Sequence, residues 1–240
     1  ISRVPSKRLV WMQCLLPFLI RRTRPQLCHF PNAMAPIWQP QPFVLTIHDA
    51  SLFLFRDYHP RARLLSIRLT LPLLARRAAA IICVSHHARE ELSRILHLDP
   101  AKVHVVYEAA PAEFKPVTAP HCLEALRRKY RLPEQFLLHV GTLEPRKNLK
   151  RLVRALHQIR RRGCDIKLVL VGTRGWHLDG FDAEIERLCL EDAVLFTGYV
   201  PTEDLPGLFS LATLFVFPSL YEGFGLPPIE AMACGAPVLT

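Results

Sequence analysis

The chain has 240 residues and half of them are apolar, which is enough for one large or two small domains with real hydrophobic cores. No stretch reaches the ~18 uninterrupted apolar residues of a membrane span, and no small-residue cleavage site follows the first apolar segment. These features exclude a transmembrane helix and an ordinary signal peptide. The formal net charge is +10, and residues 1–77 carry all of this excess, with 12 Lys and Arg against two Asp.

The uneven charge indicates an anionic partner for the first third of the chain. A membrane surface or an acidic substrate fits it as well as nucleic acid does, but no interleaved aromatic residues or nucleic-acid motif accompany it. We therefore favour peripheral contact with an anionic membrane and expect no nucleic acid, with an ordinary solvated helix face as an equal alternative. The seven widely spaced cysteines include no C-x-x-C pair, which indicates core residues in a reducing compartment.

The first elements along the chain alternate between helix and strand. A helix with basic ends is expected at residues 5–22, to lie on a membrane or to pack against the domain. Short strands are expected at residues 27–30 and 43–47. The second of these ends in His48 and Asp49, and a polar pair in this position is where ligands meet open parallel sheets. A lone His is more often structural, so both roles stay open for His48 on this evidence.

The next elements complete a first domain. The pattern predicts a basic helix at 61–77, a strand at 79–84, a helix at 86–96 with Ser85 as its N-cap, and a strand at 103–106. His86 and His87 point to different helix faces and have no evident third ligand, so no metal site is predicted. Three prolines follow without a helical repeat. We place the first domain at residues 1–110 and a Pro-rich linker at 111–120.

The second domain, residues 121–240, repeats the alternation. Strands are expected at 136–140, 167–171, 194–200 and 213–217, and helices at 122–129, from Asn148 to Arg162, up to Leu190, at 203–211 with Thr202 as N-cap, and at 229–233. Such alternation predicts parallel doubly wound sheets in an α/β protein. After the first strand, Gly141 and Thr142 would let a ligand approach the backbone, beside the cations of Arg146 and Lys147.

The loop at residues 222–226 follows the strand at 213–217 and precedes the last helix. Strand, glycine loop and helix form a phosphate-binding layout, because glycines permit close backbone approach and a helix N-terminus attracts anions. Glu222 and Glu230 stand eight positions apart, so both carboxylates can border one polyol such as a sugar or ribose. The alternative is that Glu230 only complements the helix dipole and Glu222 is a solvated acid.

Three motifs resemble one family. Glu-x7-Glu with Gly-Phe-Gly-Leu-Pro inside it, followed by Ala-Met-Ala-Cys-Gly-Ala-Pro-Val, resembles the signature of family 4, group 1 retaining glycosyltransferases. Gly-Thr-x-x-x-Arg-Lys-Asn resembles that family's donor diphosphate clamp, and Thr-Ile-His-Asp resembles its His-Asp motif in the acceptor domain. The resemblance spans nearly the whole chain and implies the GT-B fold, two Rossmann-like domains facing a cleft. The family has further elements at both ends, so we interpret the chain as a fragment with both domains incomplete.

The resemblance also implies roles for individual residues. Catalytic roles fall to His48, which would border the donor sugar, to Arg146 and Lys147, which would neutralise the leaving diphosphate, and to Glu222. The implied donor-binding set is Gly141, Thr142, Arg146, Lys147, Tyr199, Glu222, Gly223, Phe224, Gly225, Leu226 and Glu230. In this set Glu222 would contact sugar hydroxyls, the loop N–H groups the sugar and phosphates, Glu230 the ribose, and Tyr199 would stack on the base.

The implied activity is transfer of a hexosyl group from a GDP- or UDP-sugar to a glycan or lipid-linked acceptor, with retention at the anomeric carbon. The family is generally discussed as using same-face attack assisted by the leaving phosphate, with Glu222 as a covalent nucleophile the alternative. No Asp-x-Asp metal motif is present, so we expect a transferase that needs no metal and no cofactor.

The sequence also suggests a biological setting. Val-Gly-x-Arg-Gly-Trp resembles bacterial mannosyltransferase-like proteins of O-antigen and capsule assembly, which favours a mannosyl donor and polysaccharide biosynthesis. We expect a cytoplasmic protein, with a peripheral position on the inner membrane face as an open question. Two other classes stay open: a non-catalytic sugar-nucleotide-binding protein and a sugar-nucleotide epimerase of similar fold.

Overall fold

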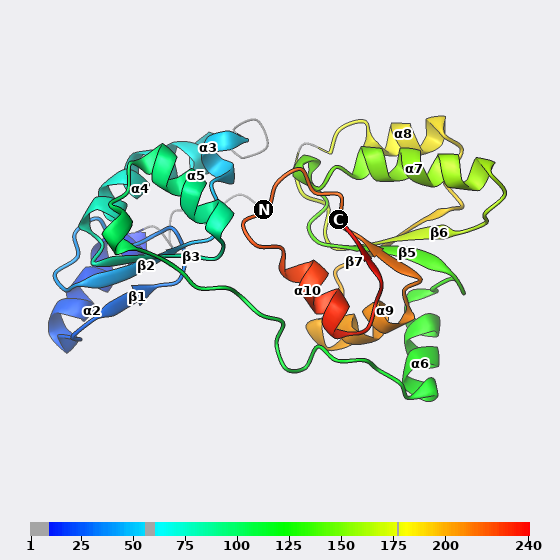
Figure 1. Ribbon diagram of the computed structural model, residues 1–240, viewed down its shortest axis with the longest axis horizontal. Helices are drawn as coiled ribbons and strands as arrows, with labels where there is room; N and C mark the ends of the chain where they lie inside the picture. Colours follow the sequence, from blue (N-terminus) through cyan, green and yellow to red (C-terminus); the bar gives the residue numbers. More distant parts are fainter. Residues whose placement is uncertain (1–9, 56–60, 177) are drawn as a thin grey trace. The chain divides into compact units, whose positions relative to one another are not determined.

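The computed structural model of the chain describes residues 10–55, 61–176 and 178–240 (Figure 1). The chain divides into two compact units, one of residues 1–108 with 222–224 and one of residues 109–221 with 225–240. Each unit contains a parallel β-sheet and several helices, which confirms the predicted α/β class. Residues 106–119, which include most of the predicted linker, form neither helix nor strand.

The first unit has a four-stranded parallel sheet in the order β1-β2-β3-β4. Its strands are β1 Cys28–Phe30, β2 Phe43–Ile47, β3 Ala80–Cys83 and β4 Val103–Val105. Its helices are the π-helical η1 Trp11–Leu15, α2 Leu16–Thr23, α3 Ser51–Leu54, α4 Arg61–Arg77, α5 His86–Leu96 and the 3-10 helix η3 Pro100–Lys102. The inner strands are apolar because both sheet faces are covered, and Leu45, Ile47 and Ile81 are almost completely buried.

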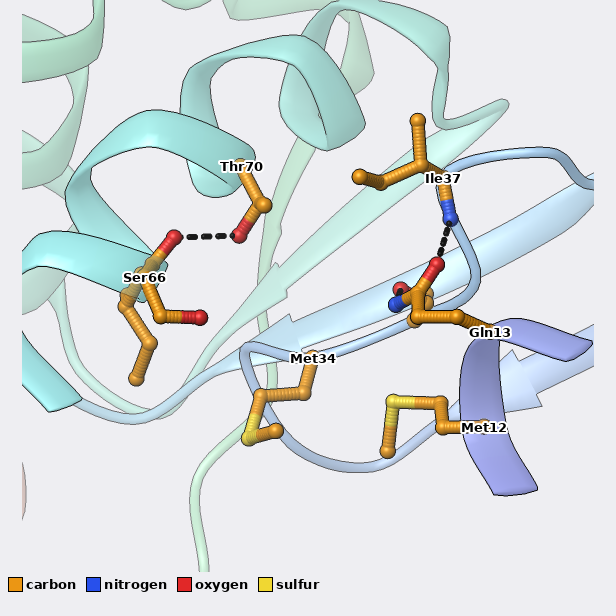
Figure 2. Close-up of a pocket in the computed structure, with 8 residues that line it drawn as sticks. Met12, Gln13, Met34, Ile37, Ser66 and Thr70 are labelled. Atoms are coloured by element: carbon orange, nitrogen blue, oxygen red, sulfur yellow. Dashed lines mark hydrogen bonds between the residues drawn. The ribbon is translucent and has the colours of Figure 1, made fainter. Parts of the chain in front are cut away.

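The N-terminal helical segment is fixed to the rest of the first unit by Gln13. Its Oε1 accepts a hydrogen bond from the Ile37 backbone N–H at 2.9 Å (Figure 2), and its Nε2 donates to the Ala35 carbonyl at 3.2 Å. A cavity of about 70 Å³ lies between η1, this loop and the α4 residues Ser66 and Thr70. Ligand pockets are larger, ~300 Å³ or more, so this cavity is too small to be one. We therefore interpret the Gln13 contacts as structural. Of the helix expected at 5–22, residues 5–9 lie outside the described residues.

The second unit has a five-stranded parallel sheet in the order β7-β6-β5-β8-β9. Its strands are β5 Phe136–Val140, β6 Lys167–Val171, β7 Val194–Gly198, β8 Leu214–Val216 and β9 Val238–Leu239. Its helices are α6 Pro120–Tyr130, the 3-10 helix η4 Pro145–Lys147, α7 Leu149–Arg161, α8 Phe181–Arg187, the 3-10 helix η5 Thr202–Asp204, α9 Leu205–Leu211 and α10 Leu226–Ala233.

Separate hydrophobic cores lie on the two faces of this sheet. Phe136 and Leu138 of β5 pack in the core that includes α9 and α10, whereas Leu137 packs with α7 and α8 on the other face (Figure 1). This alternation follows the two-residue period of a strand. The sheet order reverses between β5 and β8, and in open parallel sheets the carboxyl ends of strands at such a switch point form the ligand crevice.

Element boundaries differ from the sequence predictions at a few places. Ser85 caps α5 as predicted, accepting a hydrogen bond from Ala88 N–H at 3.0 Å. Thr202 was expected to cap a helix but instead begins η5, and α9 starts only at Leu205. α8 ends at Arg187, because Cys189 adopts a left-handed conformation with φ 51° that no helix can continue through. No helix in the described residues is long and apolar enough to cross a membrane.

Candidate functional site

The predicted site residues fall into two sets, one in each unit. The first unit contains His48, Glu222, Gly223 and Phe224. The second unit contains Gly141, Thr142, Arg146, Lys147, Tyr199, Gly225, Leu226 and Glu230. Within the second unit, most of this set follows β5 or β8, the two strands that meet at the switch point. The carboxyl ends of these two strands form the sheet edge at which the sequence predicts a bound ligand.

The turn after β5 is held tightly against the turn after β6. Gly141 N–H donates to the Val171 carbonyl at 2.9 Å, and Leu143 N–H donates to the Thr173 carbonyl at 3.0 Å. A Cβ at Gly172 would lie 2.0 Å from the Gly141 carbonyl oxygen, and Gly172 has φ 136°. Only glycine fits there, because any side chain would push the two turns apart. The backbone of this turn is therefore in a fixed position beside the exposed Thr142.

Lys147 places a cation at the same turn. The residue is only 7% exposed, and its Nζ lies 4.8 Å from the centre of the Phe217 ring. A Cβ built on Gly141 would be 3.6 Å from Lys147 Cε and 3.9 Å from its Nζ, so the ammonium group lies beside the glycine backbone. A cation that has lost most of its water gains much from an anion brought next to it. The turn can therefore receive a negatively charged group.

His139 of β5 is a neighbour of this cation that the sequence reasoning missed. Its side chain is fully buried, its Nδ1 lies 3.0 Å from the Val216 carbonyl oxygen, and its ring stacks with Phe217 at 6.0 Å. Because a carbonyl can only accept, Nδ1 carries the proton in this contact. Nε2 lies 3.9 Å from the Cβ position of Gly141. His139 and Phe217 thus form a packed aromatic wall beside Lys147.

Arg146 makes contacts on both sides of the switch point. Its Nη2 and Nε donate to Glu144 Oε1 at 2.9 and 3.2 Å, and its Nη1 donates to the Tyr221 carbonyl at 2.8 Å. The backbone carbonyl of Arg146 accepts from Leu220 N–H at 2.9 Å. Glu144 is buried and had no predicted role. The guanidinium therefore links the turn after β5 to the loop after β8.

The last helix follows the glycine loop as the pattern predicts, but it begins three residues before the expected range of 229–233. Gly225 has φ 94° and precedes α10, which begins at Leu226 with proline in its first positions. Glu230 is half-buried in the second turn, and burial raises the pKa of its carboxyl. Hydroxyl groups that donate to this partly desolvated carboxylate would recover hydration energy. Tyr199, just after β7, is 72% exposed and offers an open aromatic face.

In the first unit, His48 is held between two acceptors at the end of β2. Its Nε2 lies 2.9 Å from the Pro31 carbonyl oxygen, and its Nδ1 lies 3.1 Å from Glu108 Oε1. Glu108 is a partner that the sequence did not indicate, because it lies in the predicted break between domains.

Residues 222–224 belong to this unit and contact it closely. Ser85 Oγ donates to the Gly223 carbonyl at 2.6 Å, and a Cβ on Gly223 would lie 1.9 Å from the His48 carbonyl oxygen. The Phe224 ring lies 6.1 Å from that of Tyr107. The structure thus brings His48 and Gly223 together, and glycine is required at position 223. Among the described residues, no group of three or more His, Cys, Asp or Glu is placed to hold a metal ion.

Comparison with known families accounts for both units. Residues 2–114 match the family described as Glycosyltransferase Family 4, and residues 124–240 match the family described as Glycosyl transferases group 1. This chain belongs to the group 1 glycosyltransferases of family 4. The resemblance carried by the Glu-x7-Glu, Arg-Lys and His-Asp motifs is thereby confirmed.

Relatives of this family 4 chain include a mannosyltransferase and a kanosaminyltransferase. O-antigen chain mannosyltransferase B of Escherichia coli is 36% identical over 92% of this chain and 58% of its own length. Alpha-D-kanosaminyltransferase of Streptomyces kanamyceticus is 29% identical over 82% of this chain and 52% of its own length. The chain therefore spans between half and three-fifths of these curated relatives.

The fold of the chain is also found among solved structures. Anabaena HepE, crystallised in complex with UDP and glucose, matches 95% of this chain and 63% of its own, with a TM-score of 0.75 and 24% identity. At this identity the likeness shows a shared fold. The two parallel sheets are those of the predicted GT-B fold.

Proposed function

We propose that this chain forms part of a glycosyltransferase that moves a hexosyl group from a nucleoside-diphosphate sugar to a glycan or lipid-linked acceptor. The observation that carries the proposal is the buried Lys147 ammonium beside the Gly141 backbone, at the switch point of the second sheet. A donor diphosphate placed there would meet a desolvated cation and the N-terminus of α10. The 36% identity to an O-antigen mannosyltransferase supports a mannosyl group and a role in polysaccharide biosynthesis.

We further propose that the reaction retains the anomeric configuration and needs no metal. The bond between the anomeric carbon and the leaving phosphate oxygen breaks as the acceptor oxygen attacks the same face. The acceptor proton passes to the departing phosphate, so charge builds on the diphosphate while the sugar becomes oxocarbenium-like. Lys147 stabilises that charge, Glu222 and Glu230 bind donor hydroxyls, Tyr199 stacks on the base, and His48 borders the sugar.

Titration calorimetry of the intact protein in EDTA tests the donor assignment. Samples of GDP, UDP, GDP-mannose and UDP-glucose are compared, followed by transfer assays with the bound donor. We expect GDP and GDP-mannose to bind most tightly and mannosyl transfer to proceed without metal. Binding without transfer to any acceptor would favour a non-catalytic sugar-nucleotide-binding protein instead. Absence of binding to all four ligands would overturn the proposal.

We also propose that the first unit contacts an anionic membrane surface, which would place the protein on the cytoplasmic face of the inner membrane. On α4, Leu65, Leu69 and Leu73 recur every four residues and are 63%, 63% and 51% exposed. On α2, Phe18 is 63% exposed, and the exposed Arg21 and Arg22 follow it in the last turn. Exposed apolar side chains beside basic ones are the features of a helix that lies in a membrane interface.

Vesicle sedimentation tests the membrane proposal. Phe18→Glu with Leu69→Glu removes apolar surface and adds repulsion from anionic lipid. We expect the double variant to lose most binding to phosphatidylglycerol vesicles, since each nearby charge is worth about 1 kcal/mol at such a surface. The matched control is Ile159→Glu, at an exposed site on α7 of the second unit. Equal binding by the unsubstituted protein, the double variant and the control would contradict the proposal. Binding of the unsubstituted protein to neutral vesicles as strong as to anionic ones would contradict it too.

A further inference from the structure

Arg146 and the buried Glu144 form an ion pair in the second unit. Glu144 is 5% exposed, the Arg146 side chain is 13% exposed, and Tyr221, whose carbonyl Arg146 also contacts, is 8% exposed. All three nitrogens of the guanidinium donate to protein acceptors, two to Glu144 Oε1 and one to the Tyr221 carbonyl. A buried carboxylate needs a counter-ion, so moving Arg146 toward a ligand would leave Glu144 uncompensated.

The pair lies between the turn after β5 and the loop after β8. Glu144 precedes η4, the 3-10 turn that also contains Lys147, and Lys147 N–H donates to the Glu144 carbonyl at 3.0 Å. On the other side, Tyr221 is the last residue before Glu222. The Leu220 N–H to Arg146 carbonyl bond adds a second link between the same two segments. The turn after β5 and the loop after β8 are therefore fastened together by side-chain and backbone bonds.

We propose that Arg146 is a positioning residue: together with Glu144 it fixes the backbone at Leu220 and Tyr221, directly before Glu222. In this role Arg146 is not a cation that contacts the donor phosphate. The inference rests on the proposed function and changes the role that the family resemblance implied for Arg146. A planar guanidinium suits this task because it can bridge a carboxylate and a carbonyl at once, which an ammonium cannot do with fixed geometry. Lys147 then neutralises the diphosphate, and Arg146 sets the loop that leads to the sugar-binding carboxylate.

The two roles predict different effects of Glu144→Gln on nucleotide binding. If Arg146 only positions the loop, removing the charge of Glu144 loosens that loop, and Glu144→Gln and Arg146→Gln have the same effect. If Arg146 contacts phosphate, Glu144 competes with the diphosphate for the guanidinium. Glu144→Gln would then strengthen nucleotide binding while Arg146→Gln weakens it.

The experiment compares Glu144→Gln, Arg146→Gln and the double variant in the intact protein. We expect each single variant to lower kcat by about tenfold or more, with the Kd for the free nucleoside diphosphate changed by about twofold at most. The double variant should be no slower than the slower single variant, because the two residues act as one unit. The matched control is Arg154→Gln, because Arg154 is an exposed α7 residue that pairs with Glu184 of α8. This control should leave both kcat and Kd unchanged. Nucleotide binding at least about tenfold weaker in Arg146→Gln would overturn the proposal.

Hydrogen exchange of the peptide containing Leu220 separates this inference from the proposed function. We expect faster exchange in both single variants, with or without nucleotide, and unchanged exchange would overturn the positioning role. A wild-type protein that binds no nucleotide would refute the proposed function, yet the exchange comparison would still decide the role of Arg146. If the glutamine variants fail to fold, Arg146→Lys keeps a cation beside Glu144 without the bridge to Tyr221, and the same loss of kcat at preserved Kd is expected.

Discussion

Replacement of Lys147 by alanine is expected to lower kcat by about a hundredfold to a thousandfold, the usual effect of removing one group that stabilises transition-state charge. Charge on the leaving diphosphate is greatest when the glycosidic bond is breaking, and the ammonium is buried beside the backbone turn where that charge is proposed to develop. The effect should therefore appear mainly in turnover. Single-turnover rates with saturating donor would measure it directly.

The matched control for this substitution is Lys150→Ala. Lys150 is exposed at the start of α7 and donates to the Asp179 carbonyl at 3.0 Å, so it lies in the same unit without sharing the burial of Lys147. We expect its removal to leave kcat unchanged. Lys147 would have no part in the chemistry if both variants lost the same rate. The same would follow if Lys147→Ala kept the rate and the Tm of the unsubstituted protein.

Replacement of Glu230 by alanine is expected to act on donor binding instead. Burial raises the pKa of this carboxyl, because its charged form has lost part of its hydration, and ribose hydroxyl donors would restore that interaction. Hydrogen bonds to a charged acceptor of this kind contribute about tenfold to a hundredfold in affinity. Calorimetry with the nucleoside diphosphate should show that loss, with kcat at saturating donor changed much less.

Glu203→Ala provides the comparison, since Glu203 is an exposed acid in η5 of the same unit. Its donor affinity should equal that of the unsubstituted protein. Glu230→Gln should fall between the two, because an amide oxygen still accepts a hydrogen bond but carries no charge. If Glu230→Ala binds the nucleotide normally, the carboxylate only complements the dipole of α10.

Four of the five strands of the second unit were predicted from the sequence, whereas β9 was not. Both β5 and β6 match the expected ranges to the residue, because each is an apolar run that ends at a glycine. Gly141 and Gly172 end these runs for a reason visible in the structure: their turns approach so closely that no side chain fits at Gly172. Helix ends were less predictable, since the left-handed residue Cys189 carries no sequence signal that separates it from a helical cysteine.

The role of an individual charged residue was much harder to predict. Motif and charge identify Arg146 as a site residue, but its partners are a carbonyl 75 positions away and a neighbouring acid that reads as an ordinary turn residue. His139 was missed for the same reason, because its Nδ1 contact with Val216 spans 77 positions and exists only after β5 and β8 pair. Sequence pattern places a residue on an element, whereas its hydrogen-bond partners depend on which strands become neighbours.

The order of strands in the second sheet has a consequence for synthesis of the chain. β5 can pair with β6 soon after both leave the ribosome, but its other neighbour, β8, is complete only at Val216. At about 5–20 residues per second this leaves one edge of β5 open for several seconds. All five β5 residues are buried in the finished fold, and an open apolar edge invites association with other chains. The half of the sheet that carries Phe217, Tyr221 and Glu230 is thus the last to close, and the open edge of β5 is exposed to association with other chains during that interval.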